Sequence, residues 1–372
     1  MTVTVAANRW PRRLPRWLHP GAWWIWALGL ATAASRTTNP LLLVLIVMVA
    51  ALVVGYRRPD APWARSFDFF LRLGVVVVLV RVTVQLVFGA AMGSTLLLPL
   101  PGIVLPEWLA GIRLGGDVMA ESVLLALFDG LRLATILICI GAANSLASPH
   151  RLLKSVPTAL YEVGVSIVIA LTFTPQLITD VTRVQSARHL RGRTRRGVRA
   201  IAGSAMPVFE GALERSVTLA AAMDSRGYGR RAHLDRRGAL APTLLLVGMI
   251  AAAIGTYGLV SEDAPLLLQV PMLVAGLGIA VLSTAWASRT STRSRYRPDP
   301  WRLPEWLVSG SGVVAAVTFL LGGQWWPLAM LTQTDPPTWP ALPLLPLIGL
   351  VVAATPAITA PPLPQPMPVR DR

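Results

Sequence analysis

The sequence is poor in charge and has only one cysteine, and each shortage excludes a class of protein. Charged residues make up 14% of the 372 positions and hydrophobic residues 54%, and the mean hydropathy is +0.58. A soluble domain of this length needs more charge, so we expect the excess apolar surface to face lipid. Cys139 is the only cysteine and lies inside an apolar run, which excludes a disulfide framework and a thiolate metal site.

Motifs for catalysis and cofactor binding are also missing. No Gly-x-x-x-x-Gly-Lys phosphate loop occurs, so we expect that this chain does not hydrolyse ATP itself. The four histidines are far apart and lack the spacing of metal ligands, and no serine, cysteine or paired-carboxylate constellation indicates an active site. We therefore predict no catalytic residues, no metal site and no cofactor.

Arginine supplies nearly all of the positive charge, and its distribution indicates a membrane topology. The net charge is +16, and Lys154 is the only lysine. The arginines cluster in short loops between apolar runs, as in the cytoplasmic loops of membrane proteins, so we expect no nucleic-acid partner. Arg9, Arg12, Arg13 and Arg16 precede Trp-rich sequence rather than a cleavage site, which predicts a cytoplasmic N-terminus and no cleaved signal.

Eight apolar segments predict an all-α, polytopic membrane protein with about eight spans. The first two meet at Arg36-Thr-Thr-Asn-Pro40, a strong helix stop, and we expect them to form a tight hairpin. The segments are 21–35, 40–56, 67–92, 119–147, 241–260, 265–287, 306–327 and 341–359.

A ninth apolar segment, 158–182, does not fit a simple count of crossings. Arg151 and Lys154 precede it and seven arginines follow it between 183 and 199. If it crossed, more than ten arginines would lie outside the cell. We therefore predict that this segment stays on the cytoplasmic side, where it either enters the cytoplasmic leaflet or packs in a layer of helices beneath it. Both chain termini are predicted to lie on the same side. The Pro-rich loop 99–118, with Glu107 and Asp117, is predicted to lie outside.

These assignments divide the chain into six predicted parts. They are a cytoplasmic N-terminal segment (1–20), four transmembrane helices (21–147), a cytoplasmic helical region (148–238), a fifth transmembrane helix (239–262), a C-terminal extension with about three further spans (263–360) and a Pro-rich tail (361–372).

The cytoplasmic region contains two copies of the pattern Ala-x-x-x-Arg-Gly, at Ala187 to Gly192 and at Ala222 to Gly227. Alanine and arginine four positions apart share one helix face, and the small alanine lets a partner backbone approach. Glycine suits the left-handed residue that ends a helix, and arginine in the last turn complements the negative end of the helix dipole. Each copy thus predicts a guanidinium group at a helix tip.

A single Arg-Gly pair is weak evidence, because roughly three are expected by chance and four occur. Arg196-Gly197 and Arg237-Gly238 lack the preceding alanine. An isolated pair is more often only a helix cap, but two full copies in one cytoplasmic region favour a function.

The second copy ends a predicted amphipathic helix that begins at Pro207, where proline suits the first turn. We expect one face to pack against the membrane layer and the other to meet a partner, although such a helix could also serve only as an anchor. The apolar face has Phe209, Leu213, Val217, Ala220 and Met223, and the other face has Glu210, Glu214 and Thr218.

Four motifs together resemble the T component of energy-coupling-factor transporters, the family that includes the cobalt-importer membrane subunit. They are Leu18-His19-Pro20, Thr38-Asn39-Pro40, Thr174-Pro175 and the octapeptide from Ala222 to Gly229, which is the most specific match. The resemblance covers roughly residues 18–260, so the helix at 239–262 would close the family core. The first arginine signature departs slightly from the family pattern, with Arg188-His189-Leu190 where glutamine and small residues are common.

The resemblance implies a non-catalytic coupling subunit in the plasma membrane of a prokaryote. In the family, each signature arginine docks in one of two cytoplasmic ABC ATPase subunits; carried over, these arginines are Arg191 and Arg226, in signatures completed by Ala187, Gly192, Ala222 and Gly227. A small membrane subunit binds the substrate, a vitamin or a transition-metal ion. The alternative is a stand-alone carrier or lipid-modifying enzyme, which requires functional polar residues within the spans.

Arg81 and Asp129 are charges inside predicted spans, where ionisable residues usually have a function. Each lies about ten residues from the outer end of its span, so antiparallel neighbours would bring them to similar depth. We predict a structural ion pair rather than a substrate site, because in the resembled family a separate subunit binds the substrate.

Overall fold

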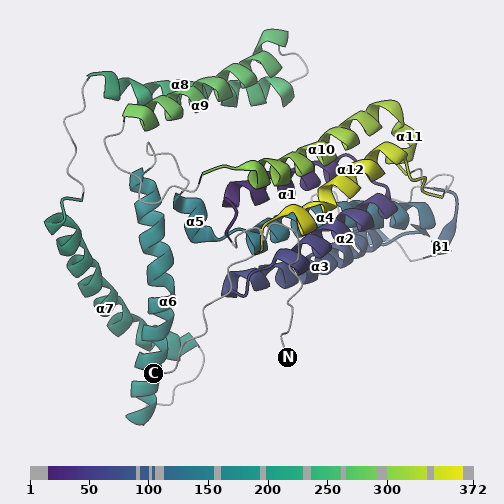
Figure 1. Cartoon of the computed structure of the whole chain (residues 1–372). Helices are drawn as coiled ribbons and strands as arrows, with labels where there is room; N and C mark the ends of the chain where they lie inside the picture. The colour runs from purple at the N-terminus through teal and green to yellow at the C-terminus, as the bar shows by residue number, and fades with distance from the viewer. Residues whose placement is uncertain are drawn as a thin grey trace, which may run out of the picture. The chain divides into compact units, whose positions relative to one another are not determined.

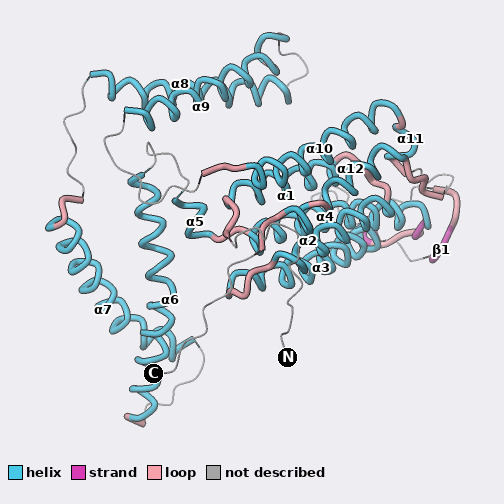
Figure 2. The backbone as a smooth tube through the Cα atoms, in the orientation of Figure 1, coloured by secondary structure: helices cyan, strands magenta, loops and turns pink. Residues whose placement is uncertain are grey.

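The computed structural model describes residues 16–88, 93–99, 103–104, 113–154, 161–192, 198–228, 236–260, 265–290, 300–332 and 339–362. These residues are almost entirely helical, which confirms the all-α class (Figures 1 and 2). The chain divides into two units, residues 1–152 with 298–372, and residues 153–297.

The first unit is a helical bundle built from both ends of the chain (Figure 1). α1 packs on α4 and on α10, and α10 packs in turn on α12. Its longer described helices are α1 (Pro20–Ser35), α2 (Pro40–Arg57), α3 (Ser66–Phe88), α4 (Ala120–Leu146), α10 (Leu303–Trp325) and α12 (Leu344–Ala354). Short turns of helix lie at η1 (Pro62–Arg65), α5 (Pro149–Lys154), α11 (Pro327–Met330) and α13 (Pro356–Thr359).

α1 and α2 begin at side chains that cap them. The His19 Nδ1 atom accepts a hydrogen bond from the backbone N–H of Gly21 at 3.1 Å, and Asn39 Oδ1 accepts one from Leu41 at 3.0 Å. A proline follows each capping residue, at a position where the missing N–H has no helical partner to lose. Two of the family-like motifs are therefore helix starts.

α1 and α10 approach closely because each has a glycine at the contact. A Cβ atom on Gly29 would lie 2.2 Å from the carbonyl oxygen of Gly312, and one on Gly312 would lie 2.4 Å from Trp26 Cα. Small residues allow this kind of backbone contact between membrane helices. Trp26 and Phe319 are fully buried beside it, and Trp26 Nε1 donates to the carbonyl oxygen of Ala353 at 2.9 Å.

The turn between α1 and α2 is held by residues near the C-terminus. Thr37 Oγ1 and the backbone N–H of Thr38 both donate to the carbonyl oxygen of Met330, at 2.7 and 3.1 Å. Asn39 Nδ2 donates to the carbonyl oxygens of Ala329 and Ala341, at 3.0 and 2.7 Å.

The predicted short turn joins the first two helices, but their main packing partners lie elsewhere. α1 packs mainly on α10 and α4, and α2 mainly on α4. The reason is that the closest partners of α1 and of the turn lie some 290 residues away, beyond any local pattern. Helices α10 to α13, predicted as part of a C-terminal extension, complete the core of the first unit.

Two small antiparallel strand pairs follow α3, in a stretch that the sequence predicts mainly as a Pro-rich loop. β1 (Leu96–Leu98) pairs with β4 (Val118–Met119), and β2 (Ile103–Val104) pairs with β3 (Arg113–Leu114). The buried Glu121 carboxylate accepts a hydrogen bond from the backbone N–H of Thr95 at 3.0 Å. Glu107 lies outside the described residues.

The second unit contains α6 (Tyr161–Leu190), α7 (Val198–Ser225), α8 (Arg236–Val260), η4 (Leu266–Leu268) and α9 (Val270–Thr290). α8 and α9 pack against each other through glycines: a Cβ on Gly255 would lie 2.4 Å from the Leu273 nitrogen, and one on Gly276 would lie 2.3 Å from the Ala252 nitrogen. The predicted helix start at Pro207 is wrong, because α7 begins at Val198 and passes through the proline. Proline removes one backbone hydrogen bond from a helix but does not always end it.

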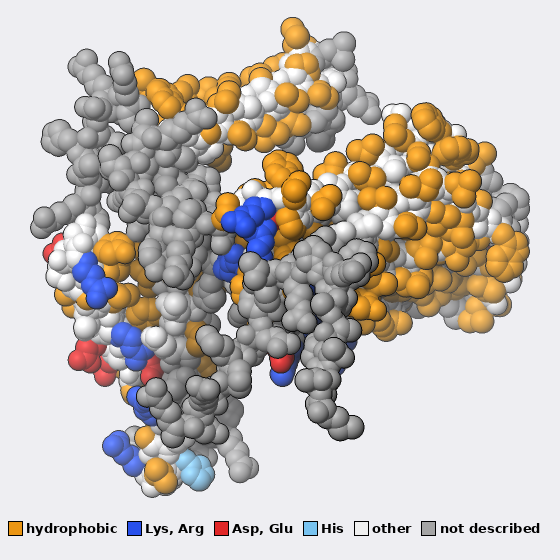
Figure 3. Space-filling view, viewed as in Figure 1, with side chains coloured by type: hydrophobic (Ala, Val, Ile, Leu, Met, Phe, Trp, Pro, Cys, Tyr) orange, Lys and Arg blue, Asp and Glu red, His pale blue; other side chains and the backbone are white. Residues whose placement is uncertain are grey.

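Six described helices are long and apolar enough to cross a membrane: α2, α3, α4, α10, residues Gly164–Leu190 of α6 and Leu240–Gly258 of α8. The segments Val270–Trp286 and Leu344–Thr359 are shorter apolar helices, and α1 has 16 residues. Apolar side chains make up most of the described surface of the first unit that Figure 3 shows. This confirms a polytopic membrane protein. Length and composition do not separate α6 from the spans, so its cytoplasmic placement stays a prediction.

Candidate functional site

The first arginine signature forms the C-terminal end of α6. The backbone N–H of Arg191 donates to the carbonyl oxygen of Ala187 at 3.3 Å, and that of Gly192 donates to His189 at 3.0 Å. Gly192 has φ of +74°, in the left-handed region that ends helices. The helix thus ends at Leu190, and Arg191 and Gly192 form the turn that follows it.

The second signature ends α7 in the same way. The backbone N–H of Gly227 donates to the carbonyl oxygen of Asp224 at 2.9 Å, and that of Tyr228 reaches back to Met223 at 3.0 Å. Gly227 has φ of +77°. This pair of hydrogen bonds defines a Schellman motif, the common glycine-dependent helix end. Both signatures therefore have the local structure that the sequence predicts for them.

The arginine of each signature is exposed to solvent. Ala187, Arg191, Ala222 and Arg226 are all exposed, and a Cβ on Gly192 or Gly227 would meet nothing within 4 Å. A guanidinium group offers five N–H donors in a rigid fork, which matches carbonyl or carboxylate oxygens of a partner. Ala187 and Ala222, four residues before the arginines, are small enough to let another backbone approach.

The two signatures lie at opposite ends of the α6–α7 pair. α6 and α7 run in opposite directions in Figure 1, joined at the end that carries Arg191. α7 has 28 residues and is therefore about 42 Å long, which places Arg226 far from that end. An ion pair missed by sequence reasoning joins the two helices, with Arg215 Nη2 2.8 Å from Asp180 Oδ2.

The predicted apolar face of α7 is exposed in this chain. Phe209 is 59% exposed, Leu213 51% and Val217 69%. Glu210 and Glu214, on the other face, are exposed as well. The expected packing of this face against the membrane layer stays a prediction.

Arg81 and Asp129, predicted to pair, are brought together between α3 and α4. Arg81 Nη2 lies 3.3 Å from Asp129 Oδ2, and Arg81 Nη1 lies 3.5 Å from Gln85 Oε1. Gly130 lets the two helices approach, because its Cβ would sit 3.2 Å from Val78 Cα. The ion pair thus forms at a close contact between two helices long enough to span the membrane.

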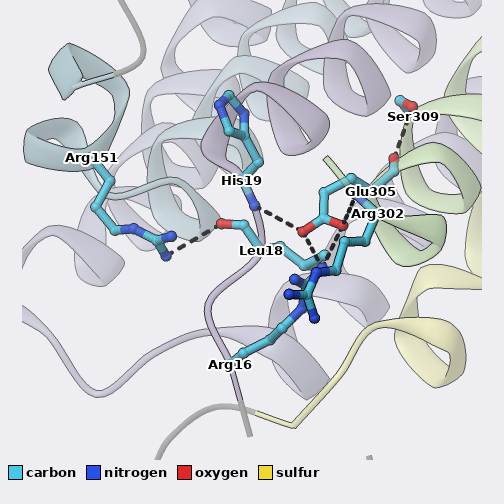
Figure 4. A network of polar contacts seen from close by, with 7 residues as sticks. All are labelled: Arg16, Leu18, His19, Arg151, Arg302, Glu305 and Ser309. Carbon is cyan, nitrogen blue, oxygen red and sulfur yellow. Dashed lines mark hydrogen bonds and ion pairs between the residues drawn. The ribbon is translucent and has the colours of Figure 1, made fainter. Parts of the chain in front are cut away.

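A second polar cluster, centred on Glu305, escaped the sequence reasoning (Figure 4). The Glu305 side chain is 1% exposed and forms an ion pair with Arg16. It also accepts hydrogen bonds from the backbone N–H groups of Arg302, at 3.0 Å, and His19, at 3.4 Å. A glutamate three residues after the start of an apolar run is a capping signal, but its long-range partners cannot be read locally. The cluster ties the start of α1 to the start of α10.

Possible metal ligands occur among the residues that the structure describes. Among those residues no three His, Cys, Asp or Glu side chains come together as metal ligands would. In the second unit, two long helices, α6 and α7, each lead into an exposed arginine. Fold and site together define a polytopic helical membrane protein with an exposed arginine at the end of each of two long helices.

Comparison with known sequences gives the family. The CbiQ family, described as cobalt transport protein, matches residues 8–235, more than half of the chain, and the chain belongs to it. The match includes both arginine signatures and ends before α8. This confirms the predicted resemblance to the T components of energy-coupling-factor transporters.

Three relatives carry the name energy-coupling factor transporter transmembrane protein EcfT. The protein of Streptococcus thermophilus is 31% identical over 126 residues, which cover 32% of this chain and 47% of the relative. That of Lactococcus lactis subsp. cremoris is 29% identical over 112 residues, 27% of this chain and 42% of the relative. That of Limosilactobacillus fermentum is 34% identical over 119 residues, 30% of this chain and 40% of the relative. The chain thus spans less than half the length of these curated relatives.

Proposed function

We propose that this membrane component couples ATP hydrolysis by two cytoplasmic ABC ATPase subunits to the movement of a small substrate-binding membrane subunit. The observation that carries the proposal is the pair of exposed arginines at two glycine-terminated helix ends. Arg191 and Arg226 would each dock in a groove of one ATPase. Ala187 and Ala222 would line the contact, and Gly192 and Gly227 would fix the geometry of the tips.

The separation of the two signatures supports two docking partners rather than one. Arg226 lies at the far end of a helix about 42 Å long from the loop that follows Arg191. A single groove suited to one helix tip cannot hold both ends of such a pair. Two ATPase subunits, related by approximate symmetry, would each take one tip.

Movement of the bound ATPases can reach the membrane helices only if the helix ends at Arg191 and Arg226 are rigidly connected to them. α6 and α7 are continuous helices, and the Arg215–Asp180 ion pair at 2.8 Å joins them. A displacement of one tip would therefore shift the whole pair. The exposed Phe209, Leu213 and Val217 would offer the apolar surface on which the substrate-binding subunit rides.

The topology that goes with this function places residues 148–238 in the cytoplasm, with both chain termini on the same side. The imported substrate would be a vitamin or a transition-metal ion. A cobalt ion is favoured by the description of the matching family, whereas the EcfT relatives are named for no substrate.

Copurification tests the proposal. The tagged full-length chain is extracted from its native membrane in a mild detergent, and the proteins that elute with it are identified. We expect two ABC ATPase subunits and one small, polytopic membrane protein in defined ratio. A chain that elutes alone, while a known transporter complex from the same membrane survives the same extraction, would contradict the coupling function.

A further inference from the structure

An arginine outside the sites described so far, Arg132, lies near the middle of α4. It comes 12 positions after Ala120 and 14 positions before Leu146. At 1.5 Å per residue these intervals are about 18 and 21 Å long. α4 is long and apolar enough to span the membrane, so Arg132 is placed at mid-membrane depth. A charge at that depth is costly unless an opposite charge compensates it, and it usually has a function.

Arg132 has no ion pair or hydrogen bond of its side chain within the part of the chain that the structure describes, and the residue is partly exposed. The carboxylate nearest in sequence, Asp129, pairs with Arg81 of α3 at 3.3 Å. Two arginines and one aspartate leave one positive charge in excess. This excess stays the same if Asp129 is shared between the two arginines.

The other carboxylates in the apolar helices cannot balance this charge, because each is already engaged. Five of the 18 acidic residues lie in the six helices that have the length and composition of spans. Besides Asp129, they are Asp68, paired with Arg58; Glu121, bound to the backbone N–H of Thr95; Asp180, paired with Arg215; and Glu305, paired with Arg16. None of these six helices therefore has a spare carboxylate for Arg132.

Lipid headgroups are too far away to supply the negative charge. Their phosphates lie at the two surfaces of the bilayer, and arginine reaches them by extending its side chain from a position near a helix end. Both intervals from Arg132 to the ends of α4 are much longer than an arginine side chain. Arg72 differs in this respect, because it comes only six positions after Ser66, where α3 begins. A carboxylate on another membrane-spanning helix, in contrast, can lie at the depth of Arg132.

The surface around Arg132 is suited to packing against such a helix. Leu125, Asp129, Arg132 and Leu133 are spaced so that they share one face of α4. Leu125 is 46% exposed and Leu133 is 49% exposed. This face thus combines apolar contact surface with one uncompensated positive charge.

We propose that this face of α4 binds a membrane-spanning helix of a partner protein through an aspartate or glutamate at mid-membrane depth on that helix. The Arg132 guanidinium group donates to the carboxylate oxygens, and the pair brings together two charges that are each costly alone in lipid. Leu125 and Leu133 pack against the apolar side chains of the same helix. The small membrane subunit of the proposed function is the expected partner, and this last assignment rests on that function.

A synthetic membrane helix tests the proposal without the natural partner. Two peptides of about 20 leucine and alanine residues, long enough to span a bilayer, differ only in a central glutamate or glutamine. Each carries an acceptor dye, and the full-length chain carries a donor dye at its C-terminus in phosphatidylcholine liposomes. Energy transfer measures binding. The wild type is expected to bind the glutamate peptide about ten-fold more tightly than the glutamine peptide.

In Arg132→Gln this preference should disappear. The variant is expected to fold as well as the wild type, because it leaves no carboxylate of the described spans without its partner. In Arg132→Glu the preference should reverse in favour of a peptide with a central lysine, which provides a second test. Arg72→Gln is the matched control and should keep the preference of the wild type.

Equal binding of the glutamate and glutamine peptides by the wild type would overturn the proposal, and so would an unchanged preference in Arg132→Gln. A preference lost equally in Arg72→Gln would show a general attraction to a cationic chain and would also overturn it.

Copurification from the native membrane distinguishes this inference from the proposed function. Arg132→Gln should retain less of the small membrane subunit than the wild type and the same amount of ATPase. Undiminished retention of the small subunit would overturn its assignment as the partner, while the coupling function would stand. A wild-type chain that retains no ATPase would contradict the coupling function, and the peptide measurement would still decide whether Arg132 binds a carboxylate.

Discussion

Arg81 of α3 and Asp129 of α4 are opposite charges within two helices that have the length and composition of membrane spans. In a lipid environment a charge that loses its partner is costly, because neither water nor a counter-ion replaces it. We expect Arg81→Ala and Asp129→Ala each to destabilise the protein by about 1–3 kcal/mol. Thermal unfolding in detergent measures the effect.

The double variant Arg81→Ala/Asp129→Ala should cost less than the sum of the two single variants, because it leaves no unpaired charge. The charge-swapped protein, Arg81→Asp/Asp129→Arg, should recover part of the loss. Additive losses in this cycle would mean that the pair contributes no coupling energy, whatever the 3.3 Å separation.

α1 and α10 depend on their glycine contact, where a Cβ on Gly312 would lie 2.4 Å from Trp26 Cα. We expect Gly312→Val to force the helices apart and to destabilise the first unit by about 1–3 kcal/mol. Gly310→Val is the control on the same helix, because nothing lies within 4 Å of a Cβ there. Equal melting temperatures for the two variants would contradict the close packing.

The arginines on both sides of α6 predict where this helix lies relative to the membrane. We predict that both of its flanks are cytoplasmic. Single cysteines at Ser155 and Thr194, in a Cys139→Ser background, are treated in sealed cells with a membrane-impermeant thiol reagent. Neither should react until the cells are opened. Labelling of either position from outside would place part of the arginine-rich region outside the cell and refute the topology.

Local patterns predict the helices well because each is an apolar run with its own stop signal. Pro20 and Pro40 open α1 and α2, and Gly192 and Gly227 close α6 and α7 as predicted. Local patterns do not predict which helices and side chains pack together. Arg16 and Glu305 are 289 positions apart, and the pairing of α1 with α10 rests on two glycines that look ordinary in the sequence. The strands after α3 are only two or three residues long, too short for a periodic signal.

The molecule as a whole combines a bundle closed by its own C-terminus with a pair of long helices that carry the arginine signatures. The family match ends at residue 235, yet α10 and α12 fill the core of the first unit. The last part of the chain therefore contributes to stability, while both arginine signatures lie within the family match. In the proposed function, the arginines at the ends of α6 and α7 are the residues that bind the ATPase subunits.

The most direct test of that coupling compares two matched double variants of the tagged full-length chain. Arg191→Ala/Arg226→Ala removes both tips, and Arg196→Ala/Arg237→Ala removes two arginines whose Arg-Gly pairs lack the preceding alanine. Each lost tip removes charge-assisted hydrogen bonds worth about 1.5–3 kcal/mol. The amount of ATPase retained by the chain in mild detergent is measured, alongside membrane insertion.

The account predicts that both variants insert normally, that the tip variant loses at least about ten-fold in retained ATPase, and that the control variant binds like the wild type. Single Arg191→Ala and Arg226→Ala proteins should each show a smaller loss. Undiminished ATPase binding and transport by the Arg191→Ala/Arg226→Ala protein would contradict the assignment of these two arginines as the coupling residues.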